Sequence, residues 1–222
     1  MTPHPLAALP FWDKLSGPEK AAAEQGLTRH TYQKGVYILG FRDVCLGIVT
    51  LHKGAIRVYL TSEEGREVTL FHISAGECCV FSAACAMGDS LPDVQMVAES
   101  EVTLSALHAR TIAALMQSNV HFRCFVYELA TRRYATVVEV LQQILFAPFD
   151  ARLARLLVRL FEERGQTTLR LTQEAMAREV NSAREVVART LRRFAEAGWI
   201  ELRRGAVVLK DPAALQALCG QA

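Results

Sequence analysis

Residues 171–198 read LTQEAMAREVNSAREVVARTLRRFAEAG, and the C-terminal third of the chain is organised around this stretch. Its first ten residues have the apolar spacing of a short amphipathic helix, with Thr172 placed as its N-cap. The connection at 180–182 is tight, and Asn181 tolerates the left-handed backbone conformation better than most residues. Residues 183–197 predict a second helix that Gly198 ends. Two short helices joined by a tight turn form a helix-turn-helix.

The second predicted helix has one apolar and one charged face. Arginine can bond the O6 and N7 atoms of guanine, and glutamate can accept from the N4 of cytosine. Because the first turns of a recognition helix reach the base edges, we predict that Arg184, Glu185 and Arg189 read bases. The alternative is a solvated basic helix face.

A short β-hairpin follows the second helix. Residues 199–202 and 206–209 are its strands, joined by a turn at 203–205, so the motif is a winged helix-turn-helix. The remaining polar positions of the motif are expected to contact phosphates, which fixes register without reading sequence. These are Thr172, Gln173, Ser182, Arg192, Arg193, Arg203 and Arg204.

Upstream of this motif, residues 110–146 contain neither glycine nor proline and show helical apolar spacing. The run predicts a short helix followed by a long one, and the long helix is expected to pack against a second copy of itself; an ordinary core helix is the alternative. The dimer-helix residues are Val126, Leu129, Tyr134, Val137, Leu141 and Ile144. Pro148 ends this element, and Asp150 is expected to cap the next helix, at 151–163.

The first half of the chain predicts strands separated by glycine turns. The expected strands lie at 36–39, 46–49, 55–60, 68–73 and 101–107, and their spacing is typical of a compact antiparallel barrel or sandwich. The fold class is therefore α+β, with an N-terminal antiparallel, jelly-roll-like β-roll. We expect a β-roll sensor domain at 1–109, a dimerisation helix and hinge at 110–147 and a winged helix-turn-helix at 148–222.

Charge divides the same way. Residues 1–150 hold 12 basic and 15 acidic side chains, whereas residues 151–222 hold 13 and 8, so the positive charge collects in the predicted DNA-binding part. No apolar run approaches the ~20 residues of a membrane span and no signal peptide is evident, so we expect a cytoplasmic protein without a membrane partner. No nucleophile with a base, carboxylate pair or phosphate-binding loop stands out, and we expect no enzymatic activity.

The whole chain resembles the CRP/FNR family of bacterial transcription regulators. The resemblance rests on Gly54-x-Ile-Arg-Val-Tyr, on Glu64-Gly-Arg-Glu-Val-Thr-Leu, on Gly76-Glu77 and, most specifically, on Arg184-Glu-x-x-x-Arg189. It implies a cyclic-nucleotide-binding-type roll and a homodimer that binds double-stranded DNA at palindromic sites. It also implies RNA polymerase as a partner. Relatives usually carry serine at the position of Ala183, so we expect Ser182 to take over the cap and the helix to begin one residue earlier.

The sensor motif departs from the family. Cyclic-nucleotide-binding relatives place an arginine after the Gly-Glu motif, but no Arg or Lys lies between Arg66 and Arg110, so we do not expect cyclic AMP as the effector. A cysteine group takes its place, and a thiol near a helix N-terminus would have a lowered pKa and react with oxidants or hold a metal or cluster. The effector-pocket candidates are Gly76, Glu77, Cys78, Cys79, Ser82 and Cys85.

Other readings of the sensor stay open. The cysteines can be ordinary core residues. Haem is a further option, with His52, His72 or Cys45 as ligands. The sequence-based prediction is a DNA-binding regulator whose roll responds to a small ligand or to a redox or metal signal. The alternatives are a cyclic-nucleotide-responsive regulator and one that binds DNA without an effector.

Overall fold

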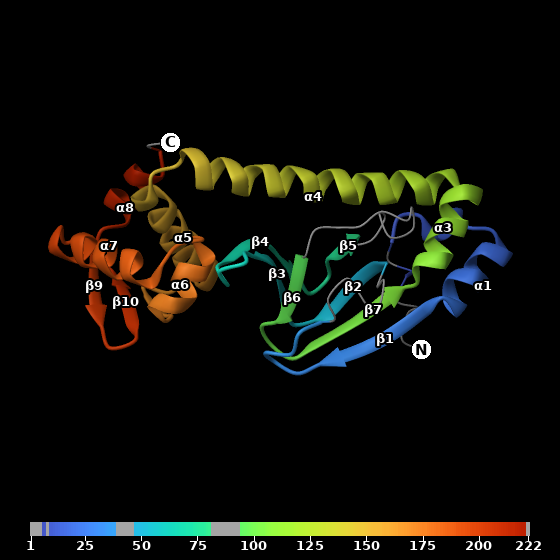
Figure 1. Ribbon diagram of the computed structural model, residues 1–222, viewed down its shortest axis with the longest axis horizontal. Coiled ribbons are helices and arrows are strands. Elements are labelled where there is room, and N and C mark those ends of the chain that lie inside the picture. Colours follow the sequence, from blue (N-terminus) through green and yellow to red (C-terminus); the bar gives the residue numbers. More distant parts are fainter. Residues whose placement is uncertain (1–5, 8, 39–46, 81–93, 221–222) are drawn as a thin grey trace. The chain divides into compact units, whose positions relative to one another are not determined.

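The computed structural model describes residues 6–7, 9–38, 47–80 and 94–220 (Figure 1). The chain forms two compact units. One holds residues 1–66 and 70–137, and the other holds residues 67–69 and 138–222. The first contains the β-sheets and the second the helix-turn-helix, which confirms the predicted α+β fold class.

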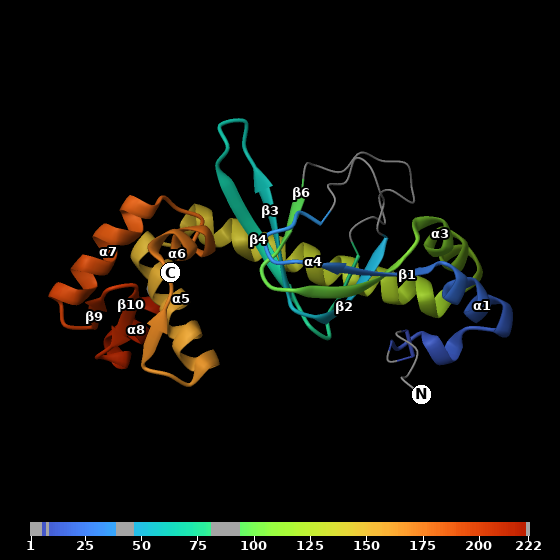
Figure 2. The same ribbon diagram turned by 90° about the horizontal axis from the view of Figure 1, so that it is seen from below.

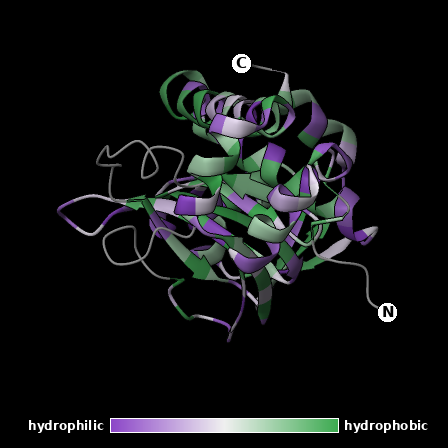
Figure 3. Cartoon of the chain, turned by 90° about the vertical axis from the view of Figure 1, so that its right-hand side faces the viewer, coloured by the Kyte–Doolittle hydropathy of each residue, from purple (hydrophilic) through white to green (hydrophobic). Residues whose placement is uncertain are grey.

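Two antiparallel sheets build the N-terminal roll. One has the strand order β1 (Leu27–Tyr32), β7 (Val102–Leu107), β2 (Ile48–Lys53) and β5 (Cys78–Val80). The other has the order β4 (Glu67–Ser74), β3 (Ala55–Thr61) and β6 (Val94–Ala98). Buried aliphatic side chains from both sheets form one core cluster, and Figure 3 shows apolar residues concentrated on these central strands. Removing this apolar surface from water is the main source of stability for the roll.

Gly54 closes the turn between β2 and β3 in a conformation that requires glycine. Its φ angle is +90°, and a Cβ atom there would clash with the backbone carbonyl of Glu101. Both the backbone conformation and the close approach exclude a side chain. The expected strands at 55–60, 68–73 and 101–107 are therefore present with small shifts in their ends. By contrast, the described part of 36–39 contributes only an isolated bridge, from Tyr37 to Val97.

Helices pack around a second core in the same unit (Figure 2). They are the 3-10 helix η1 (Trp12–Lys14), α1 (Gly17–Gln25), α3 (Ala109–Ser118) and the start of α4 (Val120–Phe146). Ser16 and Glu19 form a capping box at the start of α1. The short and long helices predicted within 110–146 are α3 and α4. The chain separates them at Asn119, whose side-chain oxygen accepts from the backbone N–H of Phe122.

The C-terminal unit is a winged helix-turn-helix with an additional helix at each end. Its elements are α5 (Phe149–Arg164), β8 (Thr168–Arg170), α6 (Gln173–Glu179), α7 (Arg184–Glu196), β9 (Ile200–Arg203), β10 (Ala206–Leu209) and α8 (Pro212–Cys219). Strands β8, β10 and β9 form one sheet. The core is built from buried side chains of α5, α6, α7 and the sheet.

Two details of the predicted helix ends were wrong. Helix α7 begins at Arg184, with Ala183 at the N-cap and no side-chain cap, so Ser182 does not take over that role. Helix α5 begins at Phe149 after Pro148, and Asp150 lies inside its first turn. An acidic residue in a first turn still favours the helix because it faces the positive end of the helix dipole.

Candidate nucleic-acid interface and sensor cavity

Helix α7 presents a charged face because its apolar residues are buried in the core. Val187, Thr190, Leu191 and Phe194 are all buried. Arg184, Glu185 and Arg189 are exposed. Among the described residues, none of these three forms an ion pair or a side-chain hydrogen bond with another residue. Their donors and acceptors are therefore available to base edges, as the sequence predicted.

The helix-turn-helix geometry comes from two asparagine and threonine side chains. Thr172 caps α6, since its hydroxyl oxygen accepts from the N–H of Ala175 at 3.1 Å. Asn181 adopts a φ angle of +52° in the turn before α7. Both predictions from the sequence are confirmed by these conformations. The cap hydroxyl satisfies a backbone donor that the helix itself leaves free.

A cavity of about 450 Å³ lies between the helix-turn-helix and the wing. Polar side chains from three elements line it, namely Thr172, Gln173, Arg184 and Arg203. Leu171, Met176, Leu191 and Val207 supply apolar walls. The cavity therefore brings one predicted base-reading residue together with three predicted phosphate-contacting residues.

The other candidate phosphate contacts differ in how free they are. Arg192 and Arg204 are exposed and form no ion pair among the described residues. Arg193 instead pairs with Asp150 at 2.8 Å, and Arg203 pairs with Glu201 at 2.7 Å. Arg203 and Lys210 together lower the pKa of Glu201 to about 2. Ser182 is half-buried in the turn.

The N-terminal unit has its own cavity, of about 490 Å³. Three predicted effector residues line it from the turn into β5, namely Gly76, Glu77 and Cys78. Helix α4 supplies most of the remaining wall through Phe125, Glu128, Leu129, Arg132 and Arg133, and Pro10 adds one edge. The sequence reading missed these helix residues because the apolar stripe of α4 pointed to dimerisation.

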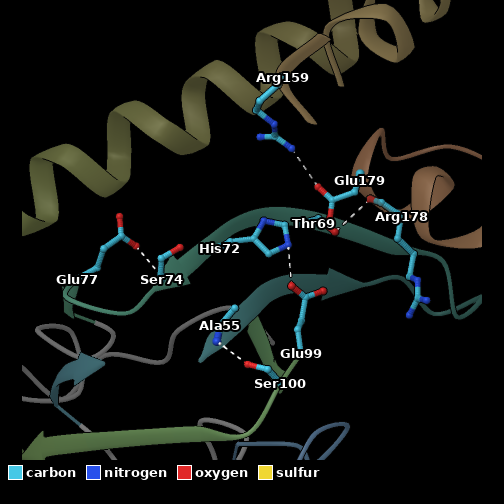
Figure 4. A network of polar contacts seen from close by, with 10 residues as sticks. All are labelled: Ala55, Thr69, His72, Ser74, Glu77, Glu99, Ser100, Arg159, Arg178 and Glu179. Carbon is cyan, nitrogen blue, oxygen red and sulfur yellow. Dashed lines mark hydrogen bonds and ion pairs between the residues drawn. The ribbon is translucent and has the colours of Figure 1, made fainter. Parts of the chain in front are cut away.

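Arg133 is held over this cavity by several groups. Its guanidinium carbon lies 4.5 Å from the centre of the Phe71 ring, and its Nη2 atom lies 3.9 Å from a Glu77 carboxylate oxygen. The first contact has cation–π geometry. Glu77 also accepts from the N–H of Ser74 at 2.8 Å (Figure 4). The cavity wall thus combines fixed positive and negative groups with apolar side chains.

The cysteine pair of β5 is buried and its members face different surroundings. Cys79 belongs to the core between the sheets, whereas Cys78 packs toward the helices. Burial raises the pKa of the Cys78 thiol to about 11 and that of Cys79 to about 12. The structure therefore favours neutral thiols at both positions, although the sequence raised the idea of a lowered pKa. Cys45, Ser82 and Cys85 lie outside the described residues.

The two sensor histidines have local partners. The Nε2 atom of His52 lies 2.7 Å from the hydroxyl of Ser105, and burial lowers the pKa of His52. His72 lies 3.4 Å from a carboxylate oxygen of Glu99 (Figure 4). Both rings are engaged by neighbours within their own unit.

Helix α4 carries an exposed apolar seam. Val120, Tyr127, Tyr134 and Leu141 recur every seven residues and all are exposed. Cys124, Thr131, Val138 and Leu145 recur with the same period, four residues further on. Alternating steps of four and three are the a/d pattern of a coiled coil. Of the predicted dimer-helix residues, Tyr134 and Leu141 lie on this seam. Val126 is instead buried in the core of its own chain, and Leu129 packs against that core.

Comparison with known domains matches both units. A Crp-like helix-turn-helix domain matches residues 151–218, and a cyclic nucleotide-binding domain matches residues 29–119. The chain belongs to the CRP/FNR family of transcription regulators. It is a regulator of that type, with a DNA-binding helix-turn-helix and a cyclic-nucleotide-binding-like domain. No helix within the described ranges is both long and apolar enough to span a membrane.

Similar CRP/FNR proteins cover nearly the full chain. A putative transcriptional regulator of the family from Eubacterium rectale is 29% identical, with a TM-score of 0.86 over 95% of this chain and 97% of that one. The cyclic AMP receptor protein of Thermus thermophilus is 24% identical over 93% of this chain and 95% of its own length. FixK2 of Bradyrhizobium japonicum is 15% identical and shares the fold, with a TM-score of 0.68 over 88% and 98% of the two chains.

Proposed function

We propose that this CRP/FNR protein binds palindromic operators as a homodimer and that its roll responds to a small ligand. The observation that carries the proposal is the exposed, unpaired set of Arg184, Glu185 and Arg189 on the first turns of α7. Two arginine forks and one carboxylate suit G·C-containing half-sites, because guanine offers two acceptors and cytosine one donor in the major groove.

The seam on α4 supports the homodimer. Aromatic and aliphatic side chains exposed at heptad spacing cost free energy in water, and a second copy of the helix would cover them. Two recognition helices related by a two-fold axis then match a palindrome, with half-sites one helical turn of DNA apart.

The cavity at Gly76–Cys78 supports a small ligand as the signal. Its thiols are buried, and their raised pKa values disfavour thiolate chemistry at neutral pH. Its arginines come from helix α4, while residues 67–109 contain no arginine or lysine that could bind a cyclic phosphate in the manner of cyclic-nucleotide-binding relatives. We therefore propose an effector other than cyclic AMP. Through the family resemblance we also propose RNA polymerase as a partner.

The decisive experiment selects bound duplexes from a random library with the purified full-length chain. Selected duplexes are then compared with shuffled versions in gel shifts, with and without cyclic AMP. We expect recovery of a palindrome, tighter binding to it than to the shuffled sequence and no effect of cyclic AMP. Equal affinity for the selected and shuffled duplexes would overturn the proposal, and a marked gain on adding cyclic AMP would overturn its effector part.

A further inference from the structure

Asn181, in the turn of the helix-turn-helix, binds the backbone of Thr69 at two points. The N–H of Thr69 donates to Asn181 Oδ1 at 2.7 Å, and Asn181 Nδ2 donates to the carbonyl of Thr69 at 3.0 Å. A third bond runs from the hydroxyl of Thr69 to the carbonyl of Arg178 at 3.1 Å (Figure 4). Both Asn181 and Thr69 are buried. We call these three bonds the Asn181 clamp.

The residues held by the clamp belong to the C-terminal unit although they open strand β4. Residues 67–69 cluster with 138–222, whereas the rest of β4 belongs to the N-terminal unit. The chain therefore passes between the units three times, after Arg66, after Thr69 and after Val137. Without the clamp, α4 is the connection that remains. With it, residues 67–69 add two further covalent connections.

An asparagine side chain suits this position for two independent reasons. Its amide offers one donor and one acceptor, which complement the carbonyl and N–H of a single residue. Asparagine also tolerates the left-handed backbone that the turn requires. Losing the amide would leave polar groups of a buried residue without partners, which is costly. The clamp leaves Arg184, Glu185 and Arg189 exposed, so it is compatible with DNA binding.

We propose that Asn181 is a positioning residue that fixes the spacing of the two recognition helices in the dimer. This inference rests on the proposed function, since it requires operator binding by a homodimer. A helix-turn-helix held by the clamp has less freedom than one held by α4 alone. A dimer with the clamp therefore prefers one half-site spacing, and a dimer without it tolerates several at lower affinity for the correct one.

The test variant is Asn181→Gly, because glycine keeps the positive φ angle of the turn while removing the amide. The measurement is the ratio of affinities for the selected operator and for the same operator with one base pair inserted between its half-sites. We expect this ratio to fall about tenfold in the variant, as expected from the loss of two hydrogen bonds. Loss of stability alone would lower both affinities together and leave the ratio unchanged.

Two further variants guard against misfolding of the first. Thr69→Val removes the hydroxyl bond to Arg178 and should lower the ratio by a smaller factor. Thr28→Val removes a similar bond, from the Thr28 hydroxyl to the carbonyl of Ala106 inside the roll, and should leave the ratio unchanged. Hydrogen exchange adds a readout without DNA, because the Thr69 amide should be protected in the native chain and exposed in Asn181→Gly.

The outcomes separate this inference from the proposed function. If the native chain shows no preference for half-site spacing, the palindromic dimer fails and the inference fails with it. If the native chain shows the preference and Asn181→Gly retains the same ratio, only the inference is overturned. Rapid exchange of the Thr69 amide in the native chain would also overturn it.

Discussion

Arg193 on α7 holds Asp150 on α5 with two nitrogen–oxygen contacts, of 2.8 and 3.4 Å. This pair ties the recognition helix to the preceding helix and occupies a side chain that the sequence assigned to phosphate binding. The neighbouring Arg192 is exposed and has no such partner among the described residues. Two adjacent arginines are therefore expected to contribute differently to DNA binding.

Replacing Arg192 by alanine should weaken the salt dependence of DNA binding more than replacing Arg193. Each phosphate contact that is lost reduces the slope of log affinity against log salt by about 0.9. We expect that full reduction for Arg192→Ala and less for Arg193→Ala, because Asp150 already neutralises Arg193. Gel shifts over a range of salt concentrations measure both slopes. A larger reduction for Arg193→Ala would show that its pair opens on DNA.

Replacing Arg184 or Arg189 by alanine should relax sequence discrimination rather than abolish binding. A bidentate arginine–guanine pair is worth about 1–3 kcal/mol of discrimination. We expect each variant to lose that amount at the operator while keeping its affinity for shuffled duplex within a small factor. Arg164→Ala, at the exposed end of α5, removes the same charge and serves as the control. Unchanged discrimination in both test variants would show that these residues do not read bases.

Oxidation should cross-link two copies of the chain through Cys124. This residue is exposed and shares the α4 seam with Tyr127 and Tyr134, and residues at such positions face their own counterparts in a parallel two-stranded coiled coil. A mild oxidant such as diamide should convert most of the native protein to a covalent dimer on a non-reducing gel.

The cysteine variants decide which thiol forms that cross-link. Cys124→Ser should abolish the covalent dimer, and Cys219→Ser should leave it intact. A dimer that persists in Cys124→Ser would show that another cysteine, and therefore another face of the chain, lies at the two-fold axis.

The helix-turn-helix was predictable because local rules alone specify it. The Thr172 cap, the left-handed Asn181 and the alternation of buried and charged positions on α7 depend on neighbours within a few residues. The Asn181 clamp was not predictable, because Thr69 lies 112 residues away in sequence. The same reason explains why Arg133 was missed as part of the sensor cavity, since only the packed fold brings α4 to the turn at Gly76–Cys78.

Long-range packing also determines how the cysteines behave. From the sequence, Cys78 and Cys79 could be reactive thiols or core residues, since the pattern of residues does not give the burial of a side chain. In the fold, strand pairing places Cys79 opposite Val49 and Cys78 opposite Thr50, in the middle of a packed sheet. Burial then disfavours the charged thiolate and decides between the two readings for this pair.

The thiols of Cys78 and Cys79 should therefore resist alkylation in the native protein at neutral pH. The thiolate is the reactive form, and a pKa raised to about 11 for Cys78 leaves very little of it at pH 7.5. The rate at Cys78 should rise with pH until the pH reaches about 11, as long as the fold persists. Mass spectrometry after timed exposure to iodoacetamide measures each site. The chain unfolded in guanidinium is the reference, since both thiols should then react at the rate of ordinary cysteines. Rapid native alkylation of Cys78 at pH 7.5 would favour a thiol sensor over a ligand-binding cavity.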